Sequence, residues 1–259
     1  MFETFPLPPH ALDTFQCGQA EARHFRRLHI WGNGSCFFHS VAALLVYRNK
    51  VQDKMITYYL AIPTNQNLVK ADEEVHHTTP AHTVHLAFHV PNRYPADKFY
   101  HNFEQIGIQL RQYLSQTITQ PRFAQFLNHA FTTEMKDILT TDAPDWITVK
   151  KELASPSKWA NIWTVKYAAW ALSLNLLFIN GTSREEPIFC GVENFNRGPW
   201  TLFIFWSGKV HFEPIVELKT ETSAQIKQRV FQTSHSFINC LQQRFESAQP
   251  GGCKIQINT

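Results

Sequence analysis

One cysteine, Cys36, stands directly after a glycine-rich turn and at the start of an apolar run typical of a helix. The turn reads Gly32-Asn33-Gly34-Ser35, and Ser35 occupies the position of a helix N-cap. A sulfur at a helix N-terminus lies beside unpaired N–H groups and the positive end of the helix dipole, which favour thiolate over thiol. We also expect backbone N–H groups of the turn to stay free to bind a developing oxyanion. Cys36 is therefore a candidate nucleophile.

A nucleophilic cysteine needs a base, and the best candidate among the 13 histidines is His211. Residues 209–213 alternate as a strand, so the side chains of His211 and Glu213 should project from the same face. A carboxylate in that position can hold the imidazole Nδ1–H and leave Nε2 facing the thiol. These residue types predict a catalytic set of Cys36, His211 and Glu213.

The segments around Cys36 and His211 together resemble the ovarian-tumour (OTU) family of cysteine proteases, which cleave ubiquitin and ubiquitin-like modifiers from proteins. The family pattern G-D-G-x-C-x-[FY]-x-[SA] matches residues 32–40 at every position but one. Residues 36–42 and 207–213 are most similar to the corresponding blocks of viral, nairovirus-type OTU proteases. A third similar feature is a tryptophan-containing turn at residues 158–163, followed by a helix and a buried strand. The likeness covers about residues 28–218.

The resemblance implies roles for further residues. The departure from the pattern is Asn33, where the family favours Asp beside the catalytic pair. Because Asn supplies no negative charge, Glu213 is the stronger candidate for the third catalytic residue, with Asn33 as the other. Trp159, Trp200 and Gly198 would line a narrow groove for a modifier tail that ends in Gly-Gly. Each tryptophan alone could equally be a core aromatic.

The composition argues against several other classes of protein. Hydrophobic residues make up 44% of the chain, which indicates a globular protein. A net charge of +3 without a basic run longer than two residues argues against a nucleic-acid partner. Five cysteines without a C-x-x-C pair predict neither a disulfide framework nor structural zinc, and they favour a reducing compartment. They are Cys17, Cys36, Cys190, Cys240 and Cys253.

The chain has no obvious targeting or membrane segment. Its N-terminus lacks the basic and apolar regions of a signal peptide, and its longest apolar stretch, residues 168–179, is too short to span a bilayer. We therefore expect a monomeric protein of the cytoplasm, or of a host cytosol if it is viral or a secreted effector. Ubiquitin or a ubiquitin-like protein is the expected partner, and the chemistry implied by the resemblance needs no cofactor.

A group of histidines between residues 76 and 89 raises the question of a metal site. On a helix, residues 82, 85 and 89 would share a face, but residues 84–90 alternate like a strand, which would point His82 and His85 apart. We predict no metal here, and instead a segment that contacts substrate. The group comprises His76, His77, His82, His85 and His89.

The pattern as a whole predicts an α+β fold, and the resemblance specifies it as a papain-like OTU fold with a small mixed or antiparallel sheet between helical lobes. We expect an N-terminal arm at 1–27, a catalytic domain at 28–218 with an extended helical region at 50–150, and a C-terminal segment at 219–259 that packs on the domain. Helices are predicted at 36–49, 99–115, 122–139 and 159–175, and strands at 176–180, 188–190, 201–206 and 209–218. The apolar stripe Ile226, Val230, Phe237, Leu241 and Phe245 predicts one long amphipathic helix.

These expectations combine into a predicted deubiquitinase, a thiol-dependent hydrolase of the isopeptide or peptide bond at the C-terminal glycine of ubiquitin or a ubiquitin-like modifier. Two alternatives stay open. A cysteine protease that processes a polyprotein or another peptide would use the same nucleophile. An inactive ubiquitin-binding module is suggested by Asn33, although intact Cys36 and His211 argue against it.

Overall fold

The structure is a computed structural model of the 259-residue chain. Four positions named above, His77, His82, Gly198 and Cys253, lie outside the residues that it describes. The described residues are 3–17, 22–30, 32–52, 54–63, 75–76, 83–92, 99–130, 144–181, 188–191, 199–207, 211–223, 225–232 and 235–248.

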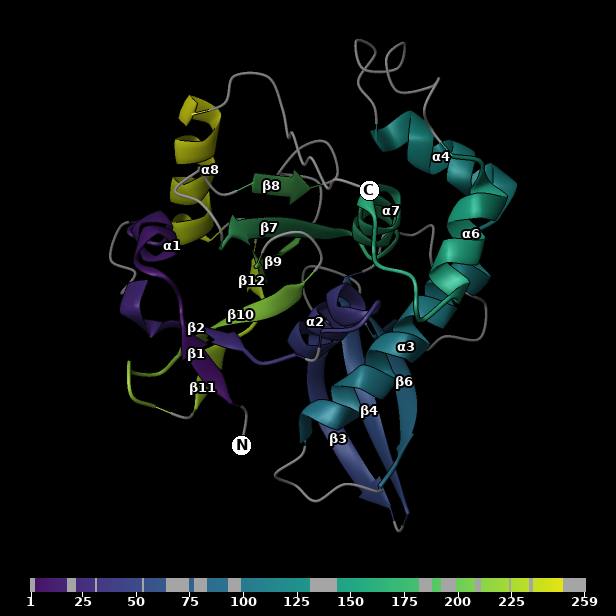
Figure 1. The fold of residues 1–259 in the computed structure, drawn as a ribbon, viewed down its shortest axis with the longest axis horizontal. Coiled ribbons are helices and arrows are strands. Elements are labelled where there is room, and N and C mark those ends of the chain that lie inside the picture. Colours follow the sequence, from purple (N-terminus) through teal and green to yellow (C-terminus); the bar gives the residue numbers. More distant parts are fainter. Residues whose placement is uncertain are drawn as a thin grey trace.

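A mixed sheet forms the centre of the described structure (Figure 1). In spatial order its main strands are β1 (Thr4–Pro6), β2 (Phe25–Leu28), β10 (Phe212–Leu218), β9 (Trp200–Trp206), β7 (Leu174–Asn180) and β8 (Ile188–Gly191). Two short strands, β11 (Ile226–Gln228) and β12 (Phe231–Gln232), pair with β10 and β9 respectively. β7 and β9 run parallel and the other pairs run antiparallel. The predicted α+β class with a mixed sheet is confirmed.

The two faces of this sheet belong to two separate cores. Along β7, Leu176 and Phe178 join the core around α2 (Cys36–Leu45), whereas Leu177 and Ile179 join a second core under α1 (Pro9–Thr14) and α8 (Ser236–Ala248). This is the period-two alternation of a strand, and here both faces are covered. Covering both faces explains why this segment reads as a continuous apolar run in the sequence.

A second sheet occupies much of the region that was predicted to be helical. Its strands are β3 (Val46–Gln52), β4 (Met55–Pro63), β6 (Thr83–Pro91) and β5 (Val75–His76), all antiparallel. The helix that begins at Cys36 ends at Leu45 instead of Asn49. The prediction was wrong because β4 is covered on both faces along most of its length, so no clean alternation marks its β-branched and aromatic residues as a strand.

The helices beyond this sheet agree better with the periodicity. α3 (Phe99–Thr117) lies across the second sheet in Figure 1 and buries the apolar positions that predicted it. α4 (Gln120–Ala130) agrees as far as the described residues go. α6 (Trp146–Ala154) and α7 (Ile162–Ala171) begin at side-chain caps, Asp145 and Asn161, which explains why α7 starts later than predicted. A short 3₁₀ helix, η1, spans Ala22–His24.

The C-terminal segment is not the single long helix that its apolar stripe predicted. Residues 226–232 contain β11 and β12, and only α8 is helical. Pairing with β9 and β10 satisfies the backbone of this stretch, and such tertiary pairing overrides a helical pattern of side chains. In α8, Phe237, Ile238 and Leu241 are buried in the second core.

A disulfide joins Cys17, just after α1, to Cys240 in α8, with their Cα atoms 5.8 Å apart. The prediction of cysteines without a disulfide framework was wrong for this pair. The two cysteines are separated by 223 positions in the sequence, so spacing gave no signal. Among the described helices, none is long and apolar enough to cross a membrane.

Candidate active site

The turn before Cys36 is built by Asn33. The Asn33 Oδ1 accepts a hydrogen bond from the N–H of Ser35 at 2.9 Å, and the Asn33 carbonyl accepts one from the N–H of Cys36 at 3.1 Å. An Asn side chain that bonds the backbone two residues on is a common way to form a tight turn. The N–H groups of Ser35 and Cys36 are therefore engaged within the turn and are not free for an oxyanion in this structure.

Helix α2 begins at Cys36 as predicted, and Ser35 is its N-cap residue, but the Ser35 hydroxyl does not cap the helix. It donates instead to the carbonyl of Pro156 at 2.9 Å. A Cβ atom on Gly34 would lie 2.5 Å from the backbone carbonyl of Ser157, closer than any side chain permits. Gly34 is therefore required because the segment after α6 packs directly on the turn.

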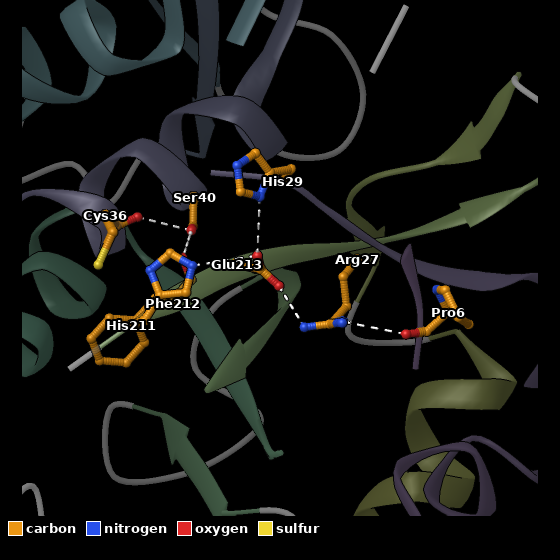
Figure 2. Close-up of polar contacts among 8 residues, drawn as sticks. All are labelled: Pro6, Arg27, His29, Cys36, Ser40, His211, Phe212 and Glu213. Atoms are coloured by element: carbon orange, nitrogen blue, oxygen red, sulfur yellow. Dashed lines mark hydrogen bonds and ion pairs between the residues drawn. The ribbon is translucent and has the colours of Figure 1, made fainter. Parts of the chain in front are cut away.

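His211 stands immediately before β10, with its ring beside the side chain of Cys36 (Figure 2). Its Nε2 lies 3.3 Å from Glu213 Oε1, and its Nδ1 is directed toward Cys36 and the Gly32 backbone. The sequence predicted the opposite assignment of the two ring nitrogens. The extra methylene of Glu213, compared with Asp, lets the carboxylate reach the far nitrogen, which leaves the nitrogen nearer the main chain for the sulfur.

Glu213 is only 5% exposed, and basic side chains lie beside both of its carboxylate oxygens. Arg27 Nη1 donates to its Oε2 at 2.8 Å, and His29 Nδ1 lies 3.7 Å from its Oε1. The Arg27 guanidinium also stacks over the Phe205 ring at 4.4 Å, which fixes its position. A buried carboxylate requires such a partner. Arg27 therefore stabilises and positions the Glu213 carboxylate, which in turn bonds His211.

The pKa of His211 is raised to about 9. The hydrogen bond with the Cys36 side chain is the largest cause, the hydrogen bond with Glu213 is next, and together with their charges they outweigh the lowering by burial. At neutral pH the imidazole is therefore protonated. A cationic ring between a sulfur and a carboxylate is the arrangement that sustains a thiolate–imidazolium pair.

Ser40 connects the helix of the nucleophile to the strand that follows His211. Its hydroxyl lies 2.9 Å from the Cys36 carbonyl and 3.1 Å from the Phe212 carbonyl (Figure 2). One hydroxyl shared between these two acceptors fixes the distance between α2 and β10. This residue belongs to the sequence motif, but only the structure shows what its hydroxyl does.

The side chain of Asn33 bonds Glu104 and the turn, and no hydrogen bond to His211 is among its contacts in the described residues. Its Nδ2 donates to Glu104 Oε1 on α3 at 2.9 Å. An Asp at position 33 would place two carboxylates against each other, so Glu104 explains why this chain carries Asn. The geometry therefore brings Glu213, and not Asn33, to His211.

The predicted groove residues are divided between two places. Trp159 is 41% exposed and follows the segment that packs on Gly34, close in sequence to the wall of the site. Trp200 instead lines a cavity of about 790 Å³ at the far end of α2, together with Leu45 and Arg229. It is six residues, or roughly 20 Å, along β9 from Trp206, which pairs with Phe212 next to His211. The structure does not bring Trp200 to the site.

The described histidines of the 76–89 group belong to the second sheet. His85 Nδ1 contacts the Tyr47 hydroxyl at 3.2 Å, and His89 Nδ1 contacts the Thr57 hydroxyl at 3.0 Å. In the part of the chain that the structure describes, no three potential ligands are grouped in a way that could hold a metal ion.

Sequence reasoning missed Arg27, His29 and Glu104, which support the catalytic set and its turn. Arg27 belongs to the segment 1–27 that was predicted only as an arm, and His29 lies just after it. The role of both depends on the pairing of β2 with β10. Glu104 lies on the predicted helix, but nothing in its spacing links it to Asn33.

Comparison with known proteins adds structural neighbours only. No protein-family model and no curated protein sequence matches the chain. One similar solved structure is an ovarian tumor (OTU) domain in complex with ubiquitin, 11% identical, with a TM-score of 0.41, covering 88% of this chain and 88% of that chain. Another is the OTU domain of OTUD1, 13% identical, with a TM-score of 0.35, covering 80% of this chain and 95% of that chain. At these values the case for function rests on the chain's own site.

Proposed function

We propose that this protein is a cysteine-type hydrolase in which Cys36 is the nucleophile, His211 the acid and base, and Glu213 the residue that orients the imidazole. The observation that carries the proposal is the contact series from Cys36 through His211 to Glu213 and Arg27, assembled from three separate segments. A structural cysteine would not need a protonated histidine beside it.

The chemistry follows from this geometry. The Cys36 thiolate attacks the scissile carbonyl, and His211 gives its Nδ1 proton to the departing amine as the thioester forms. Water then attacks the thioester after losing a proton to His211, which releases the carboxylate product and restores the thiolate–imidazolium pair. Glu213 keeps the ring oriented and stabilises its positive charge throughout.

We propose a ubiquitin or ubiquitin-like tail as the substrate, so that the protein acts as a deubiquitinase. The support is the likeness of residues 32–40 and 207–213 to OTU motifs, together with the exposed Trp159 near the nucleophile turn. The closeness to viral, nairovirus-type enzymes stays a prediction on the same motifs.

The substitution Cys36→Ala tests the proposal. It should abolish cleavage of ubiquitin chains and of a ubiquitin C-terminal reporter, while leaving the melting temperature and ubiquitin affinity close to those of the wild type. Wild-type turnover by this variant would contradict the assignment of the nucleophile. Turnover of unrelated peptides but not of any ubiquitin-like reporter would favour the alternative of a peptide-processing protease.

We also propose that the protein works as a monomer in the cytosol, of a host cell if it is viral or a secreted effector. The Cys17–Cys240 disulfide weighs against a reducing location, because disulfides persist mainly in oxidising compartments. Thiol labelling of the protein, denatured in acid directly from cells so that the buried Cys17 becomes accessible, distinguishes the two. Rapid labelling of both cysteines would agree with the cytosol, and protection of both would contradict it.

A further inference from the structure

A second charged network lies on the other side of the nucleophile turn and is centred on Arg111 of α3. The Arg111 side chain is 0% exposed. It hydrogen-bonds the Ser35 hydroxyl and main-chain carbonyls, and no carboxylate is among its hydrogen-bond partners in the described residues. These contacts are Nε to the Leu153 carbonyl at 2.9 Å, Nη1 to the Gly34 carbonyl at 2.9 Å, to Ser35 Oγ at 3.1 Å and to the Lys158 carbonyl at 2.6 Å, and Nη2 to the Glu152 carbonyl.

A fully buried guanidinium with this set of partners is costly, because a charge leaves water without a direct counter-ion. The guanidinium offsets this cost with its planar array of N–H donors, which can hold several acceptors in place at once. Here the acceptors come from two segments that must meet, the Gly34–Ser35 peptide and residues 152–158. The Phe38 ring, 4.9 Å from the guanidinium carbon, closes the site from α2.

Arg111 is one of three α3 residues that support the turn from the same helix face. Glu104 accepts a hydrogen bond from the Asn33 side chain. Gly107 lies so close to α2 that a Cβ atom there would be 2.7 Å from the backbone nitrogen of His39. Positions 104, 107 and 111 are three and four residues apart, the spacing of neighbours on one side of a helix. α3 is therefore a platform under the residues that precede and follow Cys36.

The positive charge of Arg111 also interacts with the Cys36 side chain. Burial lowers the pKa of Arg111 to about 10, while the Glu152 carboxylate and the Cys36 side chain act in the opposite direction. The guanidinium stays cationic at neutral pH, and its interaction with Cys36 is favourable when the sulfur is a thiolate.

We propose that Arg111 is a positioning residue for Cys36: it fixes the Gly34–Ser35 peptide against residues 152–158 and holds the start of α2, with the Cys36 sulfur, opposite His211. The effect on substrate turnover rests on the proposed function. The effect on thiol reactivity does not, because it can be measured without any ubiquitin.

A second arginine, which is half-buried, offers a matched control. Arg229 also donates to main-chain carbonyls of the α2 region, those of Ala43 and Val46 at 3.3 and 3.2 Å, but at the end of the helix opposite Cys36. Burial lowers its pKa too. Arg111→Met and Arg229→Met thus remove comparable side chains from the two ends of α2.

The experiment measures the rate of Cys36 alkylation by iodoacetamide from pH 5 to 10, the melting temperature, and kcat and KM on a ubiquitin C-terminal reporter. This small uncharged reagent suits a sulfur as buried as that of Cys36. We expect Arg111→Met to move the alkylation profile to higher pH and to lower kcat by about 10- to 100-fold with little change in KM, because a small misplacement of a reacting group has that cost. Arg229→Met should lower only the melting temperature.

Arg111→Lys keeps a cation but loses the planar array of donors, so it should recover part of the alkylation profile and less of kcat. It also serves as the test if Arg111→Met does not fold. A folded Arg111 variant with wild-type kcat and an unmoved profile would overturn the proposal. So would an equal loss in Arg229→Met, since both arginines would then act only through stability. Failure of the wild type to cleave any ubiquitin reporter would contradict the proposed function, while the alkylation profiles would still decide the role of Arg111.

Discussion

A histidine lies on each side of α2, the buried His39 and the half-buried His211, and the two are set in opposite protonation states. His39, on the side of α3, has its pKa lowered to about 3 by burial and by the charge of Arg111. His211, on the side of β10, has its pKa raised to about 9 by Cys36 and Glu213. Burial lowers the pKa of both rings, so the hydrogen bonds of His211 with Cys36 and Glu213, which have no counterpart at His39 among the described residues, decide the outcome.

The hydrogen-bond partners make the same distinction. Neither ring nitrogen of His39 has a hydrogen-bond partner among the described residues, and its ring packs against Gly107. His211 has a carboxylate on one nitrogen and the nucleophile beside the other. His39 therefore acts as a neutral packing residue although it lies only three positions from Cys36, whereas His211, far away in sequence, is the acid and base of the proposed mechanism.

Replacing each histidine with leucine is the strongest test of the difference between His39 and His211. His211→Leu should lower kcat on a ubiquitin reporter by about 10²- to 10⁴-fold, since general acid–base catalysis is worth that much. His39→Leu keeps a side chain of similar bulk and removes two unpartnered nitrogens, so kcat should stay within a few fold of the wild type. Equal losses in the two variants would refute the division of roles.

Glu213→Gln should reduce kcat by about one to four decades, because the ring loses the carboxylate that orients it and stabilises its charge. The same change removes a cause of the raised pKa of His211, so the alkaline limb of the pH–rate profile should move to lower pH. Asn33→Ala is the comparison variant. A larger loss of kcat in Asn33→Ala than in Glu213→Gln would reverse the ranking of the two residues.

Asn33→Asp tests the α3 side of the turn. The new carboxylate would face Glu104 where a hydrogen bond now exists, and we expect a loss of about 1–3 kcal/mol in the free energy of unfolding. Adding Glu104→Gln restores a donor opposite the new carboxylate and should recover most of this loss. Urea unfolding of the four proteins of this cycle gives the coupling, and independent effects at the two sites would contradict the contact.

The pH dependence of stability should have opposite signs for the two histidines. The proton on His211 stabilises the fold below about pH 6.5, and this contribution is lost as pH rises through about 9. His39 stays neutral in the fold while the unfolded chain takes up a proton, so its cost appears as pH falls from about 6.5 toward 3.

Each slope is at most about 1.4 kcal/mol per pH unit, the value for one proton. Urea unfolding of the wild type and the two leucine variants, without reductant so that the disulfide stays closed, measures both windows. If the free energy of unfolding of the wild type changed with pH in the same way as that of His39→Leu between pH 4 and 6, the assignment of His39 as neutral would be contradicted.

The sequence predicted the parts of the site that depend on local order. A glycine turn ahead of Cys36 starts a helix there, and alternation around His211 brings Glu213 to the imidazole, because these relations need only a few neighbouring residues. The positions of the late strands along the chain and the span of α3 followed from periodicity for the same reason.

The rest depends on pairings between distant segments. Arg27 reaches Glu213 only because β2 pairs with β10, and Cys17 reaches Cys240 only because α1 and α8 share a core. The second sheet was missed because coverage of both faces of β4 hides its alternation. Which ring nitrogen of His211 faces the sulfur depends on how far the Glu213 side chain reaches. A pattern of residue types does not encode so small a distance.

The most direct test of the central claim is a ubiquitin whose C-terminal glycine is replaced by an electrophile, with the site of attachment located by mass spectrometry. We predict a single covalent adduct on Cys36, absent in Cys36→Ala, much slower in His211→Leu, and formed at nearly the wild-type rate in His39→Leu. No adduct from a protein whose Cys36 still reacts with iodoacetamide, or an adduct on another residue, would contradict the account.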